Sequence, residues 1–208
     1  MDSLNRLEEI FAHFPGIGPR QAKRFVYYLL NKSPASIKEF TQLIEEVKKS
    51  TAECSSCHRF FIGTNVKAAV CPVCSDSSRD TSLLMVVARD SDFESIEKSG
   101  AYRGLYFILG GTVPILDKEP EKRIRLNALV QRLTDKESPV KEVILSLNAT
   151  PDGENTAEIV GKSLEELMSS RKTLYLSKVS VLGRGLSTGA ELEYVDADTI
   201  KSALQNRH

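Results

Sequence analysis

Four cysteines that stand close together are the residues of this sequence best suited to chemistry. They form two CxxC pairs, Cys54 with Cys57 and Cys71 with Cys74, with residues 58–70 between them. Each pair makes a tight turn that aims both sulfurs at one point, so four thiolates can lie at the corners of a tetrahedron. Such a donor set leaves no position open for water. The pattern therefore predicts one structural zinc ion per chain, with iron left open as an alternative metal.

Two other interpretations of the cysteine window are weaker. Four buried free thiols would not account for the spacing of the pairs. His58, next to Cys57, could replace a ligand, but a solvent-exposed neighbour is the expected role.

Clustered thiol pairs are typical of metal binding in a reducing compartment. Because neither a secretory leader nor a membrane span is recognisable, the sequence predicts a cytoplasmic protein without a membrane partner.

A glycine-rich turn followed by basic residues is the second candidate for chemistry. Gly16 and Gly18 let the backbone turn tightly and approach a ligand, and N–H groups at the start of the next helix can face a phosphate. No acidic residue occurs between Pro15 and Lys38. The basic residues of the first two helical turns are Arg20, Lys23 and Arg24. This arrangement favours contact with a DNA backbone, against the alternative of a plain helical hairpin with a solvated basic face.

The charge of the whole chain restricts where DNA could bind. The 28 basic and 28 acidic residues cancel to a formal net charge of zero. A nucleic acid must therefore meet a local basic surface, because the protein as a whole does not attract it.

The elements that must position these groups fall into a helical part and a mixed part. Apolar residues recur at helical spacing over Ser3–Phe14, from Pro19 to Leu30, and over Ala35–Lys49. After the cysteines, β-rich runs alternate with helical ones, which is typical of an α/β domain with a mostly parallel sheet. The expected strands are Leu83–Val87, Leu105–Leu109, Val143–Leu147 and Thr173–Val179. The expected helices are Asp92–Ser99, Glu121–Leu133, Thr156–Met168 and Asp198–Asn206.

The order of these modules resembles the RecR family of bacterial recombination mediators over nearly the whole chain. The matching stretches are Phe14–Arg20, the cysteine pairs ending near Arg79 and Asp80, Leu109–Gly111, and Gly185 through Tyr194. The resemblance implies an α/β multi-module protein with a short C-terminal strand and helix tail. The implied domains are a helix-hairpin-helix DNA-binding region at 1–52, a four-cysteine zinc finger at 53–80, a Toprim domain at 81–177 and a C-terminal oligomerisation segment at 178–208.

The resemblance also implies a function. The implied function is a non-enzymatic DNA-binding scaffold in recombinational DNA repair. The scaffold is expected to form a tetrameric ring and to act with RecO and RecF to load RecA on single-stranded DNA. The implied DNA contacts are Gly16, Gly18, Arg20, Lys23 and Arg24. Three acids, Asp90, Asp92 and Glu154, are candidate contacts to RecO, although an exposed acid is more often only a solubilising charge.

The positions that bind magnesium in catalytic Toprim relatives are poor in carboxylates here. Those relatives have a glutamate at the end of the first strand and a DxD turn after a later strand. In this sequence the first strand runs into Ala88, and the later turn offers Asp152 and Glu154. This set is thin for a hard divalent cation, so no catalytic residue is predicted. The rival hypothesis is a metal-dependent Toprim nuclease or primase, and a third is a zinc-stabilised protein-interaction module that touches no nucleic acid.

Overall fold

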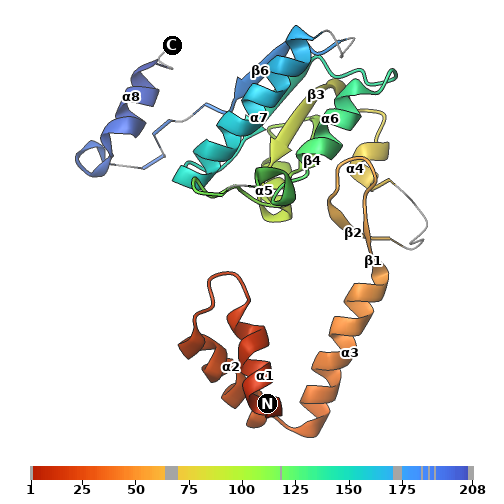
Figure 1. The fold of residues 1–208 in the computed structure, drawn as a ribbon, viewed down its shortest axis with the longest axis vertical. Helices are drawn as coiled ribbons and strands as arrows, with labels where there is room; N and C mark the ends of the chain where they lie inside the picture. Colours follow the sequence, from red (N-terminus) through yellow and green to blue (C-terminus); the bar gives the residue numbers. More distant parts are fainter. Residues whose placement is uncertain are drawn as a thin grey trace. The chain divides into compact units, whose positions relative to one another are not determined.

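The computed structural model describes residues 2–63, 70–117, 119–170, 175–183, 185–186, 188–189 and 191–205. The chain divides into two compact units, Met1–Thr51 and Ala52–His208. Helices make up the first unit, and the second contains a small two-stranded finger and a larger sheet (Figure 1). None of the described helices is long and apolar enough to cross a membrane.

Three helices form the N-terminal unit, at nearly the predicted positions. They are α1 (Ser3–Ala12), α2 (Pro19–Leu30) and α3 (Pro34–Ser50). The first helix ends two residues before the predicted Phe14, because the N–H of Phe14 donates to the carbonyl of Phe11 in a tighter turn. Pro19 and Pro34 each occupy the first helical position, where the missing N–H costs nothing.

The N-terminal unit buries little of its apolar surface. Helix α1 packs against α2 through aromatic contacts, with ring centroids 5.7 Å apart between Phe11 and Phe25. Only Ala22 and Val26 are fully buried among the described residues of these three helices. Helix α3 buries no residue completely, and its apolar stripe is exposed.

The second unit contains a four-stranded sheet in the order β4-β3-β5-β6, and all three neighbouring pairs are parallel. This sheet confirms the predicted mostly parallel α/β fold. The strands are β3 (Asp80–Val87), β4 (Gly104–Ile108), β5 (Glu142–Ser146) and β6 (Lys178–Val181). The connecting helices are α5 (Asp90–Ser99), α6 (Leu126–Thr134) and α7 (Pro151–Ser169).

Helices cover both faces of the sheet, so the central strands are apolar on both sides. On one face Leu84 and Val86 pack with residues of α6 and α7, such as Leu129 and Leu164. On the other face the alternate residues of β3 and β4 pack around Phe93 of α5. The continuous apolar run of β3 follows from this two-sided burial.

Three predicted elements start five residues away from their predicted first residue, for identifiable reasons. Helix α6 starts five residues after the predicted Glu121, because a 3₁₀ turn, η1 (Pro120–Lys122), comes first and the N–H of Arg125 donates to the carbonyl of Leu109. Helix α7 starts earlier than predicted, because Thr150 caps it and Pro151 takes its first position. Strand β6 begins later than predicted, and the predicted start at Thr173 lies outside the described residues.

The remaining elements are short. The finger consists of β1 (Thr51–Glu53) and β2 (Phe60–Ile62), which pair with each other, and α4 (Pro72–Ser75). The C-terminal segment contains a 3₁₀ turn, η2 (Leu192–Tyr194), and α8 (Ala197–Gln205). The sequence predicted α8 almost to the residue, and the expected last residue, Asn206, lies outside the described part of the chain.

Candidate metal centre and nucleic-acid interface

The four cysteines converge in the finger as predicted. Their Sγ atoms all lie within 4.8 Å of one another, and those of Cys57 and Cys71 are 3.7 Å apart. Cys54, Cys57 and Cys71 are buried, and Cys74 is half-buried. Four thiolates at this separation match the closed donor set of a structural metal site, in which the ion stabilises the fold and offers no position for a substrate.

Local backbone geometry aims the first pair of sulfurs. The N–H of His58 donates to the carbonyl of Cys54 at 2.9 Å, and the N–H of Cys54 donates to the carbonyl of Arg59 at 2.9 Å. His58 adopts the left-handed conformation, with φ of 62°, which closes the turn. The N–H of Cys71 donates to the Cys54 sulfur at 3.3 Å, so a backbone donor already faces a sulfur that carries charge when a metal is bound.

The thiols also respond to one another electrostatically. Hydrogen bonds from the Cys57 and Cys71 side chains lower the pKa of Cys54, whereas the contact with Cys54 and burial raise the pKa of Cys57. A divalent cation would allow all four groups to be thiolates at once, and this donor set fits zinc.

His58 is neither a ligand nor a solvent-exposed neighbour. Its Nδ1 lies 2.8 Å from Oε1 of Glu53, and its ring meets Phe107 edge-on with centroids 5.2 Å apart. The imidazole thus braces the finger against the sheet. The prediction that His58 is exposed to solvent was wrong, because the ring packs against Phe107, which is distant in the sequence.

The finger covers the free edge of the sheet. Strand β4 is the outermost strand on this side, and the N–H of Ile108 donates to the carbonyl of Cys57 at 2.8 Å. The guanidinium of Arg132 on α6 donates to the carbonyls of Ser56 at 2.8 Å and Tyr106 at 2.9 Å. An unpaired strand edge promotes aggregation, and the finger removes that hazard.

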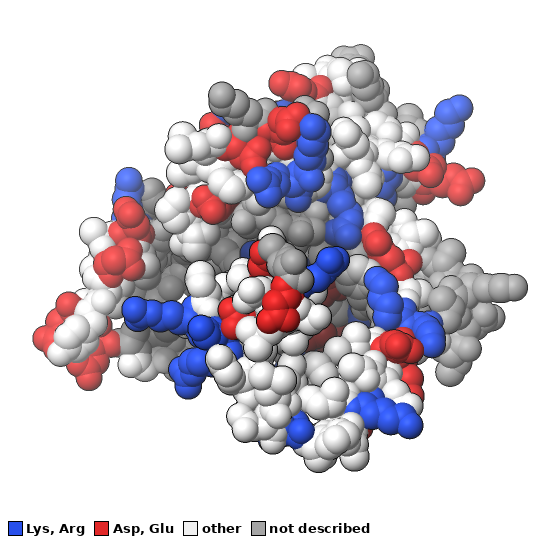
Figure 2. Space-filling view, turned by 60° about the horizontal axis from the view of Figure 1, so that its bottom comes forward, with Lys and Arg blue, Asp and Glu red and all other residues white. Residues whose placement is uncertain are grey.

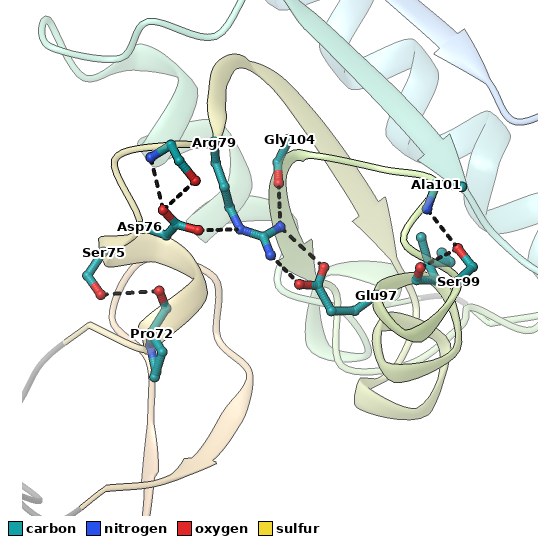
Figure 3. Close-up of polar contacts among 10 residues, drawn as sticks. Pro72, Ser75, Asp76, Arg79, Glu97, Ser99, Ala101 and Gly104 are labelled. Atoms are coloured by element: carbon teal, nitrogen blue, oxygen red, sulfur yellow. Dashed lines mark hydrogen bonds and ion pairs between the residues drawn. The ribbon is translucent and has the colours of Figure 1, made fainter.

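A second anchor joins the end of the finger to α5 and β4 (Figure 3). The guanidinium of Arg79 hydrogen-bonds to both carboxylate oxygens of Glu97 and donates to the carbonyl of Gly104 at 3.1 Å. Figure 3 shows the Arg79 side chain between the carboxylates of Glu97 and Asp76, and its Nε lies 3.7 Å from Asp76. The anchoring roles of Arg79 and Arg132 were not predicted from the sequence, because a lone arginine gives no sign of a distant partner.

Asp90 and Asp92, which are predicted to contact a partner, accept hydrogen bonds within the fold. Oδ1 of Asp90 accepts from the N–H of Phe60 at 2.9 Å, which joins β2 to α5. Oδ2 of Asp92 accepts from the N–H of Arg89 at 3.0 Å and helps to cap α5. Glu154 is exposed in the first turn of α7.

The Toprim positions show no carboxylate cluster within the described residues. Ala88 is completely buried at the end of β3, and Asp152 lies in the first turn of α7. In the part of the chain that the structure describes, the four cysteines are the one group of three or more His, Cys, Asp or Glu residues whose ligand atoms come together.

The two glycines of the N-terminal turn have different roles. Gly16 has φ of 76°, a conformation that other residues rarely adopt, and a Cβ there would meet nothing within 4 Å. Gly18 has φ of −86° and is the N-cap of α2, with no side-chain cap. Gly18 thus offers no side-chain acceptor to the first N–H groups of α2, whereas the side chains of Asp2 and Ser33 cap α1 and α3.

The predicted basic cluster is exposed and unpaired. Arg20, Lys23 and Arg24 are exposed on α2, and none of them is in an ion pair with another described residue. Elsewhere the charges are mixed, and Figure 2 shows basic and acidic side chains interspersed over the face in view.

A hollow of about 590 Å³ beside α6 provides a contrast. It is lined by three cations, and each of them has a carboxylate partner. The pairs are Lys122 with Glu119 at 2.6 Å, Arg123 with Asp117 at 2.7 Å and Arg125 with Glu53 at 3.4 Å. Its cations are therefore largely neutralised, whereas Arg20, Lys23 and Arg24 of the hairpin form no ion pair with another described residue.

Known proteins match almost the whole chain. The Toprim domain family matches residues 82–175, and the RecR C-terminal family matches residues 185–208. The recombination protein RecR of Bifidobacterium adolescentis is 38% identical over 206 residues, which cover 99% of this chain and 95% of that protein. The RecR proteins of Chloroflexus aggregans and Psychrobacter cryohalolentis are 36% and 35% identical, over 97% and 93% of this chain and 91% and 90% of those proteins. This agreement confirms the resemblance inferred from the motifs, and the chain belongs to the RecR family.

Proposed function

We propose that this protein is a non-enzymatic DNA-binding scaffold in recombinational DNA repair, which acts with RecO and RecF to load RecA on single-stranded DNA. The observation that carries the DNA-binding part is the unpaired basic cluster at the uncapped start of α2. The relatives named recombination protein RecR support the place in recombination.

The proposed DNA contact combines two kinds of donor. Arg20, Lys23 and Arg24 supply charge, and the backbone N–H groups of Arg20 and Gln21 supply directional donors at the positive end of the helix. The positive φ of Gly16 allows the tight turn that leads into the start of this helix. All of these groups recognise phosphate rather than bases, so binding should be independent of sequence.

We propose that the Toprim domain is not catalytic. Magnesium-dependent phosphoryl transfer requires clustered carboxylates, and the described residues bring no such cluster together. The glutamate position at the end of the first strand is the buried Ala88, which cannot bind a cation.

The N-terminal unit supports the proposed homo-oligomeric ring. Its helices form an apolar groove of about 710 Å³, lined by Phe11, Phe25 and Phe40 among others. Large apolar side chains of α3 remain about half exposed, such as Leu43 at 51% and Ile44 at 54%. Exposed apolar surface of this extent is typical of an interface. We assign the groove to contact with a second copy, and we propose a tetrameric ring that also uses the C-terminal segment 178–208.

The remaining assignments follow from the same proposal. Residues 1–52 form the DNA-binding region, 53–80 the zinc finger and 81–177 the Toprim domain, in a cytoplasmic protein. Asp90, Asp92 and Glu154 are proposed contacts to a basic surface of RecO. Because the side chains of Asp90 and Asp92 accept hydrogen bonds within the fold, each acid variant is tested for partner binding together with its melting temperature.

The decisive experiment measures DNA affinity by fluorescence anisotropy over a salt series, with the double variant Lys23→Glu, Arg24→Glu. The loss of two phosphate contacts should lower the affinity at least about tenfold and reduce the slope of log affinity against log salt by about 1.4 on single-stranded DNA. Lys122→Glu, Arg123→Glu is the matched control, because it reverses two cations that already have carboxylate partners.

Three results would overturn parts of the proposal. Equal losses in both variants would show non-specific electrostatics rather than a hairpin site. Unchanged binding in the Lys23→Glu, Arg24→Glu variant would remove the hairpin as the DNA site. Magnesium-dependent cleavage or synthesis on product gels, abolished by Asp152→Ala or Glu154→Ala, would establish the nuclease or primase alternative.

A further inference from the structure

The metal centre has a charged neighbour outside the finger sequence. Arg132 lies on α6, whose apolar face carries the buried Leu129 and Leu133. Its guanidinium donates to the carbonyl of Ser56, which lies between Cys54 and Cys57 in the first CxxC turn. The same nitrogen donates to the carbonyl of Tyr106 in β4. Arg132 thus contacts the metal-binding turn and the sheet at once.

The charge of Arg132 is not balanced by a carboxylate. The ion pairs among the described residues give it no acidic partner, in contrast to Arg79, which is paired with Glu97 and Asp76. Burial lowers the pKa of Arg132, and the charges of Cys74, Cys57, Cys54 and Cys71 act in the opposite direction. Its hydrogen bond to Ser56 holds this cation at the turn that carries Cys54 and Cys57, which are thiolates when a metal is bound.

A divalent metal with four thiolates carries a net charge of about −2, because each bound cysteine is deprotonated. A charge of that size in a partly buried site is stabilised by nearby hydrogen-bond donors and cations. Backbone N–H groups of Cys57, Cys71 and Cys74 donate to sulfurs of the cluster but carry no net charge, and the guanidinium of Arg132 is a cation bonded to the carbonyl of Ser56 in the first CxxC turn.

We propose that Arg132 is the counter-charge of the metal–tetrathiolate centre and couples metal binding to the docking of the finger on the Toprim sheet. With metal bound, the guanidinium neutralises part of the negative charge and holds the CxxC turn against β4. Without metal, neutral thiols leave Arg132 as a partly buried cation with no counter-charge, so the docked position of the finger loses its electrostatic support. The proposal is independent of whether the hairpin binds DNA.

The test compares Arg132→Lys with Arg132→Gln in the full-length protein. Both side chains can donate a hydrogen bond to a carbonyl, but only lysine keeps the charge. Zinc affinity is measured by competition with a chromophoric chelator, and cobalt substitution reports the tetrahedral thiolate geometry. We expect Arg132→Gln to weaken zinc binding by about tenfold or more, as loss of an outer contact to a metal site does. Arg132→Lys should stay within about threefold of the wild type, which is well below that effect.

A matched control separates charge balance from simple docking. Arg79→Gln removes the other arginine that fixes the finger to the sheet, but its partners are carboxylates rather than the cysteine cluster. It should lower the melting temperature with and without metal while leaving zinc affinity nearly unchanged. Arg132→Gln should lower the melting temperature mainly in the metal-loaded protein.

The proposal is overturned by either of two results. Equal weakening of zinc binding by Arg132→Lys and Arg132→Gln would show that the geometry of the guanidinium matters and its charge does not. Equal destabilisation of metal-loaded and metal-free protein by Arg132→Gln would reduce Arg132 to a structural hydrogen-bond donor. If Arg132→Gln fails to fold, the zinc affinity of Arg132→Lys decides, because a loss of tenfold or more would contradict a role through charge.

Discussion

The two units of this protein bury their apolar residues to different extents. The finger and the Toprim sheet cover each other, with hydrogen bonds from Ile108, Arg132 and Phe60 across the junction. The N-terminal helices have equally regular apolar stripes, yet Phe40 and its neighbours on α3 remain exposed. Amphipathic sequence therefore shows that a face will be covered, but it does not show whether the chain itself covers that face or a partner does.

The largest effect should come from removing a metal ligand. Cys71→Ser leaves three thiolates and opens the site, so bound metal should fall to nearly none, measured by elemental analysis. Because structural zinc supplies much of the folding energy of small metal domains, residues 52–80 should become sensitive to protease. The N-terminal helices lie in the other unit and should resist digestion as before.

Ser56→Ala is the control for this ligand removal, because Ser56 contributes its carbonyl rather than its hydroxyl to the junction. It should retain metal and protease resistance. General collapse of both units after Cys71→Ser would contradict the independence of the two units.

The next effect tests the exposed face of the N-terminal unit. Phe40→Glu places a charge in the apolar groove, where burial of a carboxylate against a second copy is costly. The protein should shift to a smaller oligomer in light scattering, while the melting temperature of the Toprim unit stays the same. Leu116→Glu, at a 91% exposed position of the second unit, should leave the oligomer unchanged. An unchanged oligomer in Phe40→Glu would remove the groove as an interface.

The variant Glu97→Gln, with a smaller expected effect, tests how firmly the finger is anchored. Burial raises the pKa of Glu97, but the hydrogen bond and charge of Arg79 outweigh it, so the pKa lies below its ordinary value of 4.5. A carboxylate with a lowered pKa stabilises the fold above its unfolded pKa, and this contribution is lost as the pH falls through the folded value. Glu97→Gln should therefore cost about 1–3 kcal/mol at neutral pH and much less in acid, measured by urea unfolding.

Glu158→Gln is the control for the anchor, because its ion pair with Lys162 is exposed. Surface pairs of this kind contribute little, so its unfolding midpoint should not move at either pH. A pH-independent loss in Glu97→Gln would show that packing, rather than the charge on Glu97, holds the anchor.

The smallest effect distinguishes the two glycines of the hairpin. Gly16→Ala forces a side chain into the left-handed region and should cost about 1 kcal/mol of unfolding free energy. Gly18→Ala has an ordinary φ and meets only the flexible Gln21 side chain at 3.2 Å, so its loss should be smaller. Equal losses would mean that Gly18 is also required for its conformation.

Sequence periodicity was sufficient for the elements whose signals are local. The bounds of α2 follow from a proline at its first position and an apolar stripe that stops at Leu30. Strands β3, β4 and β5 were recognised because both of their faces are buried, which makes them continuously apolar. The start of α6 could not be predicted, because it depends on a hydrogen bond from Arg125 to Leu109 in a different element.

By itself, the sequence determined the metal centre and the basic hairpin, because each is built from residues close together in the chain. Two CxxC turns aim their sulfurs through local backbone geometry, and the basic residues of α2 lie within two helical turns. The tertiary structure alone decided the role of His58 and Asp90 as braces and the positions of Arg79 and Arg132 at the junction. Those roles depend on partners about 25 or more residues away, Phe107 in the case of His58, and no local spacing encodes which groups will meet.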